Sequence, residues 1–238
     1  MSKPQQVAIS RVVSIALPVA LQSLLMSTLS LVDQLMVGQI GSTAVASVGI
    51  GAQVTMLVSV VVTALSTAVG AFTAQFAATD QIGQVRGALR YASFVAMCIA
   101  APVFTVGAIS PALLVRPFTA DPHLEATGAP YLRLVALWVL PTAVILVCTA
   151  IMRSMGKTKL PLQAAAAAIF VNLFLDWVLI FGNLGAPRLG LVGAGVGSLV
   201  ARLLECICIV IATMRLLGTK GWGERMPAAM RRKIRDAA

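Results

Sequence analysis

Hydrophobic residues along the chain gather in six long runs that are separated by short polar stretches. Each run is long enough for a helix rising 1.5 Å per residue to cross about 30 Å of hydrocarbon. The pattern therefore predicts an all-α, polytopic membrane protein, with a six-transmembrane-helix bundle over residues 1–217. The six expected spans cover roughly residues 12–37, 44–78, 88–115, 129–152, 160–181 and 189–217.

Breakers and small residues modify this picture. Pro18, Pro102 and Pro141 lie inside apolar runs, where each removes a backbone donor that neighbouring helices must compensate. We interpret Pro102 and Pro141 as tolerated prolines, and Pro18 as a site where the first helix bends. The glycines of residues 190–198 are spaced so that another helix can approach closely.

Composition supports the membrane assignment. Hydrophobic residues make up 59% of the 238 residues and charged residues only 11%, whereas soluble domains average about 45–50% and about 25%. The four cysteines lie in apolar runs and are expected to be small buried residues rather than disulfides or metal ligands.

The net charge of +10 is distributed unevenly along the chain. With the N-terminus inside, the outer side receives only Arg116, Arg133 and Arg188, which is the positive-inside pattern. We therefore expect a multi-pass protein of the cell membrane with both termini cytoplasmic. Residues 218–238 form a basic cytoplasmic tail that anionic lipid would attract. Nucleic acid is a poor candidate partner, because aromatics are sparse and no binding motif is present.

Four ionisable side chains fall well inside the spans: Asp33, Asp176, Arg202 and Glu205. A charge in hydrocarbon costs at least ~2.5–3.5 kcal/mol, so such residues are functional candidates by default. Arg202 and Glu205 are three residues apart and can form a structural ion pair on one helix face. The alternative interpretation of that pair is an inward gate.

Asp33 and Asp176 are expected at one depth. Asp33 precedes Gly38 by five residues and Asp176 precedes Gly182 by six, which places both roughly 7–9 Å from the outer helix ends. Asn172 lies one turn before Asp176 on the same face. These hard oxygen ligands suit a proton or sodium rather than zinc or copper. The alternatives are that Asp33 bonds a neighbouring backbone and that Asp176 reaches the outer interface.

Motifs typical of enzymes are absent from the sequence. There is no His-Glu-x-x-His, no Gly-x-Ser-x-Gly and no Cys–His pair. The single histidine, His123, is expected in a loop. We therefore expect neither an enzyme nor a bound cofactor.

Around these residues the chain resembles the multidrug and toxic compound extrusion (MATE) family. Its first-helix pattern of Pro, Val-Asp and Val-Gly is matched at Pro18, Asp33 and Gly38. Four further stretches match in order: residues 75–80, residues 153–161, the pair Asn172 and Asp176, and residues 193–198. Each motif is weak alone, but their order along nearly the whole apolar chain is fairly specific.

The resemblance implies a secondary transporter that exports small organic, cationic or amphipathic compounds by proton- or sodium-coupled antiport. It implies a cation-responsive site at Asp33, Asn172, Asp176 and Ser198, with sodium, if used, at the first three. It also implies bending of the first helix at Pro18. The alternatives are a flippase of lipids or lipid-linked precursors, and a truncated fragment that does not transport.

The chain departs from the family pattern in several places. Gln34 replaces the usual Thr after the aspartate, Ala77 and Ala78 replace a Gly-Ala pair, and Ser198 stands for Thr but keeps the hydroxyl. The largest departure is length, because family members have twelve helices in two bundles. Residues 226–238 resemble the loop between those bundles. A second six-helix half or a homodimer partner is therefore expected for transport, together with a small-molecule substrate and membrane lipid.

Overall fold

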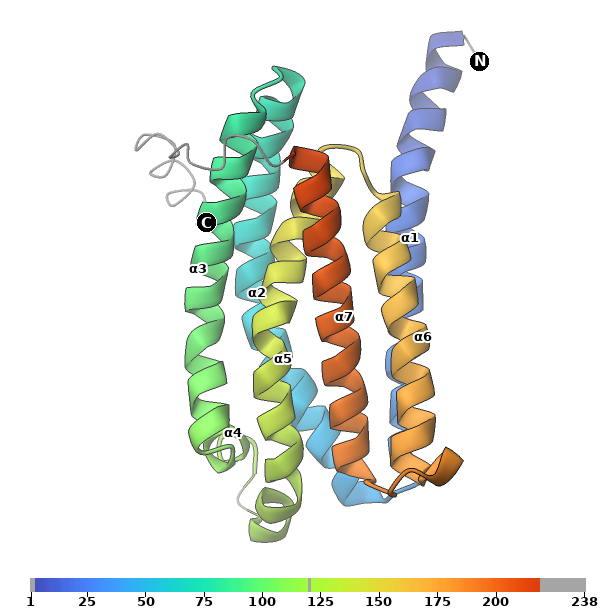
Figure 1. Ribbon diagram of the computed structural model, residues 1–238, viewed down its shortest axis with the longest axis vertical. Helices are drawn as coiled ribbons and strands as arrows, with labels where there is room; N and C mark the ends of the chain where they lie inside the picture. Colours follow the sequence, from blue (N-terminus) through green and yellow to red (C-terminus); the bar gives the residue numbers. More distant parts are fainter. Residues whose placement is uncertain (1–2, 120, 219–238) are drawn as a thin grey trace.

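The computed structural model describes residues 3–119 and 121–218 and is built from helices (Figure 1). Six of the described helices are long and apolar enough to cross a membrane. A one-turn helix, α4, and a 3₁₀ turn, η1 (Asn183–Gly185), complete the described elements. The helices are α1 (Lys3–Gly38), α2 (Ser42–Ala78), α3 (Ile82–Ile109), α4 (Ala112–Val115), α5 (Pro122–Ser154), α6 (Lys159–Phe181) and α7 (Leu191–Leu217).

Several helix boundaries differ from the sequence expectation: α1 begins at residue 3 rather than 12, and α3 at residue 82 rather than 88. The expected third span, residues 88–115, is divided, because α3 ends at Ile109 and Pro111 follows. A proline lacks a backbone donor and disfavours helix in the residue before it. The fourth span begins earlier than residue 129, since Asp121 caps α5 by accepting from the backbone N–H of His123 at 2.9 Å. His123 is therefore in the first turn of a helix and not in a loop.

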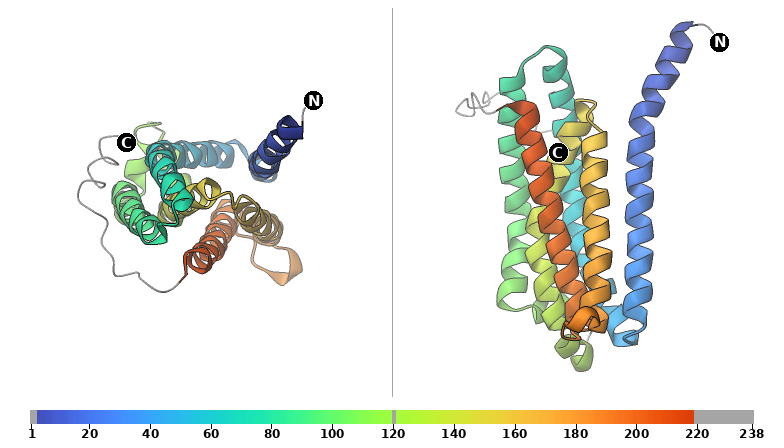
Figure 2. Two further views of the ribbon diagram at one scale, coloured as in Figure 1. Left: turned by 90° about the horizontal axis from the view of Figure 1, so that it is seen from above. Right: turned by 45° about the vertical axis from the view of Figure 1, so that its right-hand side comes forward.

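Helix α5 lies at the centre of the bundle and packs against α2, α3 and α7. Helix α6 packs against α7 on the opposite side from α3 (Figure 1). Helix α1 is held mainly by α6 and touches α2 and α7 much less. It is helical through Pro18 and leans away from the other helices toward its N-terminal end (Figure 2). Helix α1 is therefore the least constrained of the long helices.

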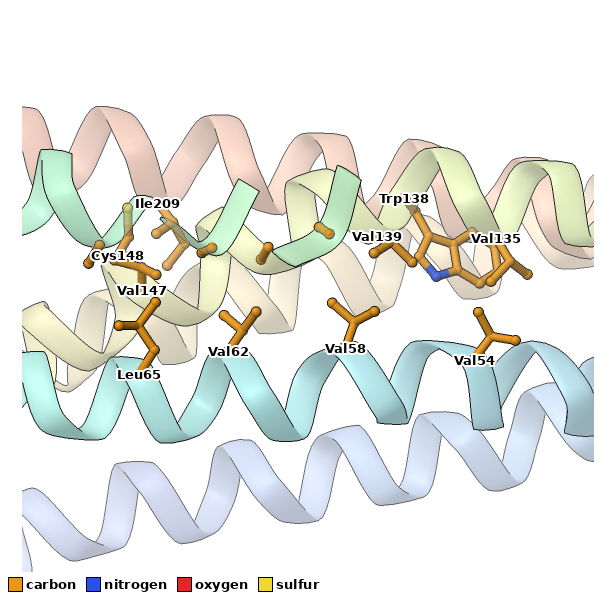
Figure 3. Packing of buried hydrophobic residues seen from close by; sticks show 14 of the residues in the cluster. Val54, Val58, Val62, Leu65, Val135, Trp138, Val139, Val147, Cys148 and Ile209 are labelled. Atoms are coloured by element: carbon orange, nitrogen blue, oxygen red, sulfur yellow. The ribbon is translucent and has the colours of Figure 1, made fainter. Parts of the chain in front are cut away.

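The apolar core lies between α2, α3, α5 and α7. Val54, Val58, Val62 and Leu65 recur about once per turn on α2 and face α5 (Figure 3). They pack against residues of α5 and α7 that include Val139, Val147 and Ile209. The other face of α2 leaves Met56, Leu57, Val60 and Val61 exposed. Since lipid is as apolar as a protein core, exposed leucines and valines are expected on a membrane-facing surface.

Because lipid-facing and core-facing surfaces are both apolar, an apolar run does not show whether its cysteines are buried. Cys148 is buried and Cys206 is half-buried, but Cys98 and Cys208 are exposed. The expectation that all four are buried was therefore wrong for two of them. An apolar run predicts a span without showing which face of that span meets lipid.

The glycine-rich start of α7 brings α6 and α7 together, as its spacing predicts. A methyl group at Gly193 would lie 2.7 Å from the backbone carbonyl of Leu179. Such a contact is closer than van der Waals packing allows, so a larger residue would push the helices apart. This close approach lets short side chains of α6 reach α7.

Candidate functional site

The site is built on the face of α6 that meets α7. Asp176 and Asn172 are one turn apart on this face and are only 1% and 2% exposed. Gly197 of α7 lies directly opposite Asp176, and a methyl group there would collide with Asp176 Oδ1. Helix α7 therefore leaves space for this carboxyl group only because residue 197 has no side chain.

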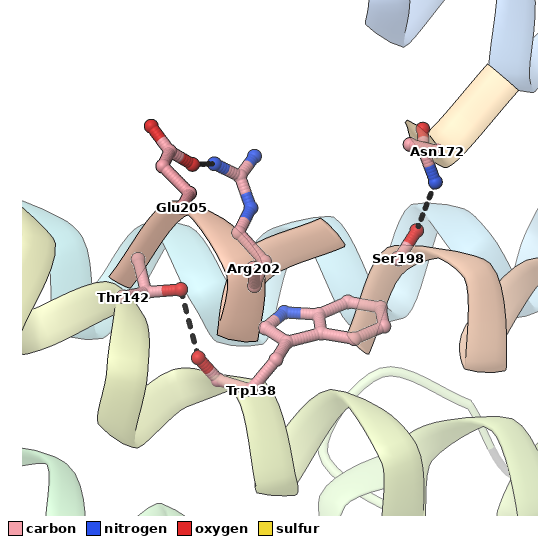
Figure 4. A network of polar contacts seen from close by, with 6 residues as sticks. All are labelled: Trp138, Thr142, Asn172, Ser198, Arg202 and Glu205. Carbon is pink, nitrogen blue, oxygen red and sulfur yellow. Dashed lines mark hydrogen bonds and ion pairs between the residues drawn. The ribbon is translucent and has the colours of Figure 1, made fainter. Parts of the chain in front are cut away.

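Ser198 of α7 completes this part of the site. The Asn172 amide Nδ2 donates to Ser198 Oγ at 3.4 Å (Figure 4). In this arrangement the amide nitrogen faces Ser198, and Asn172 Oδ1 points away from the hydroxyl. A long bond of this kind is weak and leaves the site adjustable.

Asp33 reaches the same place from α1. The carboxyl groups of Asp33 and Asp176 lie close enough for each to act on the charge of the other. A small cavity between α1, α6 and α7 is lined by Asp33, Asn172 and Ser198 together. The structure thus brings together all four residues that the sequence singled out for cation coupling.

Three oxygen atoms of this cluster are buried without a hydrogen-bond partner: Asp33 Oδ1, Asn172 Oδ1 and Asp176 Oδ1. All three are acceptors, and a buried acceptor without a donor costs free energy comparable to a lost hydrogen bond. A proton on one carboxylate, or a cation bound among the oxygens, would supply what the described side chains lack. As ligands for an ion, these carboxylate, amide and hydroxyl oxygens fit a hard cation.

Arg202 and Glu205 lie further along α7 and form an ion pair at 2.8 Å (Figure 4). Glu205 is 1% exposed, while the Arg202 side chain is 33% exposed. Arg202 is also close enough to Asp33 to act on its charge. Glu205 therefore holds the Arg202 guanidinium beside the acidic cluster.

A cavity of about 600 Å³ opens on the other side of Asp33, between α1, α2, α5 and α7. Its walls include Tyr131 and Trp138, whose rings meet edge to face with centroids 5.9 Å apart. Trp138 Nε1 donates to Thr55 Oγ1 of α2 at 3.4 Å. Asp33 lines both this cavity and the small one, so it joins the acidic cluster to a space large enough for an organic molecule.

Sequence reasoning missed several residues of this interior. Tyr131 and Trp138 are seven residues apart, a spacing that places both on one helix face and that could have been noticed. Arg153 was assigned to a cytoplasmic loop, but its Nη2 donates to the buried Gln22 of α1 at 2.7 Å. The side chain of Pro18 and the basic tail of residues 219–238 lie outside the described part of the structure.

Comparison with known proteins agrees with this architecture. The sequence profile of the MatE family matches residues 18–178. The chain is 26% identical over 202 residues to the probable multidrug resistance protein NorM of Bacillus subtilis (strain 168), covering 85% of this chain and 44% of that protein. It is 28% identical over 207 residues to the protein of the same name from Bacillus licheniformis, covering 83% and 43%. The chain thus spans less than half the length of these relatives.

Solved structures share the fold. A MATE crystal structure in the straight conformation superposes with a TM-score of 0.79 at 17% identity, covering 95% of this chain and 50% of that one. An outward-facing MATE transporter of the MOP superfamily gives a TM-score of 0.74, also at 17% identity, covering 94% and 49%. On the matched profile and this fold, the chain belongs to the MatE family of membrane transporters and corresponds to the N-terminal half of its members.

Proposed function

We propose that this chain is the N-terminal half of a transporter that exports small organic compounds in exchange for protons or sodium ions. The observation that carries the proposal is the cluster of three buried oxygen acceptors without donors at Asp33, Asn172 and Asp176. Two carboxylates in contact repel each other unless a proton or a cation lies between them. In this proposal, the proton or sodium ion that binds at the cluster is the ion that drives transport.

Ion occupancy would act on α1. Asp33 belongs to α1, Asp176 belongs to α6, and α6 is the main neighbour that holds α1. A proton or sodium ion at the cluster links the two helices, and its departure leaves two negative charges that favour separation. Pro18 supplies a weak point at which α1 bends. Because α1 lines the large cavity, a change in ion occupancy that moves α1 would change the shape of that cavity and so affect substrate binding.

The substrate class follows from the large cavity and from the relatives. The cavity holds about 600 Å³, has aromatic walls at Tyr131 and Trp138, and has Asp33 at its edge. An organic cation is attracted both to an aromatic face and to a carboxylate. The relatives are named as probable multidrug resistance proteins, in agreement with broad substrate acceptance.

A partner and an orientation complete the proposal. Since the relatives are about twice as long, a second six-helix half or a second copy of this chain would close the transport path. The uneven distribution of basic residues supports an orientation with both termini in the cytoplasm and the acidic cluster nearer the outer surface. Reagents that label a single engineered cysteine from one side of the membrane would test this orientation.

Efflux of a fluorescent cation such as ethidium from cells that produce the chain tests the function. We expect efflux to require a proton or sodium gradient, and to be lost in Asp33→Asn. Unchanged efflux in Asp33→Asn would contradict the proposed coupling of transport to an ion at Asp33. Lack of efflux by a chain that still binds the coupling ion would instead show that a separate second half is required.

The flippase alternative predicted a wide basic cavity, for which Arg202 was the only interior base apparent from the sequence. The structure adds Arg153, which lines a second cavity together with Arg202. A lipid-flipping assay in proteoliposomes separates this alternative from cation-coupled export.

A further inference from the structure

A second large cavity lies between α1, α2, α5 and α7. It has a volume of about 570 Å³ and shares Arg202 with the Asp33 cavity, but it is not lined by Asp33 or Asp176. Polar side chains from all four helices line it, among them Gln22, Thr63, Thr149 and Arg153. Much of the lining is apolar, but a polar group buried among these helices is costly unless water or a ligand satisfies it.

Two donors of this cavity are buried without a hydrogen-bond partner: Thr149 Oγ1 and Arg153 Nε. They are one turn apart on α5 and so lie on one helix face. Thr149 is only 7% exposed. Other hydroxyls around the cavity are satisfied, because Ser66, Thr67 and Thr142 each donate to a carbonyl of their own helix at 2.7–2.8 Å. Thr149 and Arg153 therefore stand out as donors that lack an acceptor.

The charges of the cavity favour an anion. Arg153 Nη2 donates to Gln22 Oε1 at 2.7 Å, and a neutral amide does not compensate its charge. Within residues 3–119 and 121–218, Arg153 forms no ion pair. Glu205 is the acid that lines this cavity, and Arg202 at 2.8 Å neutralises it. A positive charge without a counter-ion remains at Arg153.

We propose that this second cavity binds an oxyanion, a carboxylate or phosphate, carried as the head of an amphiphile. The Arg153 Nε–H and the Thr149 hydroxyl donate to its oxygens, and charge-assisted bonds of this kind are among the strongest in proteins. Ile145 and Leu146, which lie on the same wall, take the apolar part. The donors of this site, Arg153 and Thr149, are not part of the acidic cluster, although Arg202 lines the cavities of both.

Equilibrium dialysis of the full chain in dodecyl maltoside at low salt, with labelled dodecyl phosphate as the probe, tests this site. We expect saturable binding that weakens at least about tenfold in Arg153→Gln and severalfold in Thr149→Val, which keeps the side-chain shape. Arg133→Gln is the matched control: it makes the same change on an exposed residue of the same helix and should bind like the original chain.

Inorganic phosphate as a competitor distinguishes the source of the oxyanion. Displacement of the probe by millimolar phosphate shows that the head alone is recognised, whereas lack of displacement shows that the chain of an amphiphile is required as well. Absence of saturable binding, or equal affinity in the original chain, Arg153→Gln and Thr149→Val, would overturn the proposal. Thermal unfolding of each variant shows that it is folded, and Thr149→Val alone decides the matter if Arg153→Gln does not fold.

Discussion

Asp176 of α6 lies against Gly197 of α7 so closely that a single added methyl group would collide with its carboxyl oxygen. We therefore expect Gly197→Ala to displace Asp176 and to lower the free energy of unfolding by about 1–3 kcal/mol, as overpacking of a close contact does. Sodium or proton binding should weaken in the same variant. Thermal unfolding and ion titration of the solubilised chain measure the two effects.

Gly49→Ala provides the control for that substitution. Gly49 is also a helical glycine, but a methyl group there would meet no atom within 4 Å. Since alanine is the better helix former, Gly49→Ala should leave stability unchanged or raise it slightly. An equal loss of stability in both variants would show that the collision with Asp176 is not the cause.

Asp33 and Asp176 should act as one unit. Asp33→Asn and Asp176→Asn each remove one of two carboxyl groups that act on each other's charge, so either change alone should abolish ion-coupled efflux. The double variant should then be no worse than either single one, because effects within one unit are not additive. Asp80→Asn, at the exposed turn after α2, should retain efflux. Independent, multiplying losses for the two aspartates would contradict a shared site.

The Ser198 hydroxyl should matter more than the size of its side chain. Ser198→Ala removes the acceptor of the 3.4 Å bond from Asn172, so we expect weaker ion binding with a loss of stability of about 1 kcal/mol or less. Ser198→Thr keeps the oxygen and should bind the ion as the original chain does. Ion titration compares the two variants. Equal ion affinity in Ser198→Ala and Ser198→Thr would show that the hydroxyl does not contribute to the site.

The Arg202–Glu205 pair gives a prediction about stability. Glu205→Gln leaves Arg202 facing a neutral amide and should destabilise the fold by about 1–3 kcal/mol, less than for a fully buried pair because Arg202 is partly exposed. Removing both charges in Arg202→Gln with Glu205→Gln should restore part of that loss. Thermal unfolding in detergent provides the measurement.

An exposed ion pair supplies the reference for this effect. Arg116 and Glu125 are 3.4 Å apart, with the Arg116 side chain 64% exposed. Glu125→Gln should therefore change stability by less than about 1 kcal/mol. If Glu205→Gln were no more damaging than Glu125→Gln, the interior pair would contribute little to the fold.

The common depth of Asp33 and Asp176 could be predicted from the sequence, because their distance from the next glycine turn fixes how far along each helix they lie. The apolar runs likewise predicted the spans, since the length of a run is set by the thickness of the membrane. The Arg202–Glu205 pair followed from helical spacing alone. These successes all concern positions along one helix.

What could not be predicted depends on how each helix is rotated. In a soluble protein the polar face of a helix shows which way it points, but here both faces are apolar because one meets lipid. Helix rotation determines three features that the sequence did not reveal: the contact between Arg153 and Gln22, the packing of Asp176 against Gly197, and the exposure of Cys98. The sequence therefore identified candidate residues, but it did not show which residues of other helices contact them and so determine their chemistry.

Ion binding to the solubilised chain tests the central claim most directly, because it needs neither a substrate nor a second half. Proton release on addition of sodium should be saturable in the original chain and absent from both Asp33→Asn and Asp176→Asn. On a step in pH, both variants should release fewer protons than the original chain, while Asp80→Asn keeps the response to sodium. Release of the same size in the chain that lacks the Asp33 carboxylate would contradict the account, since the exchangeable ion would then be held elsewhere.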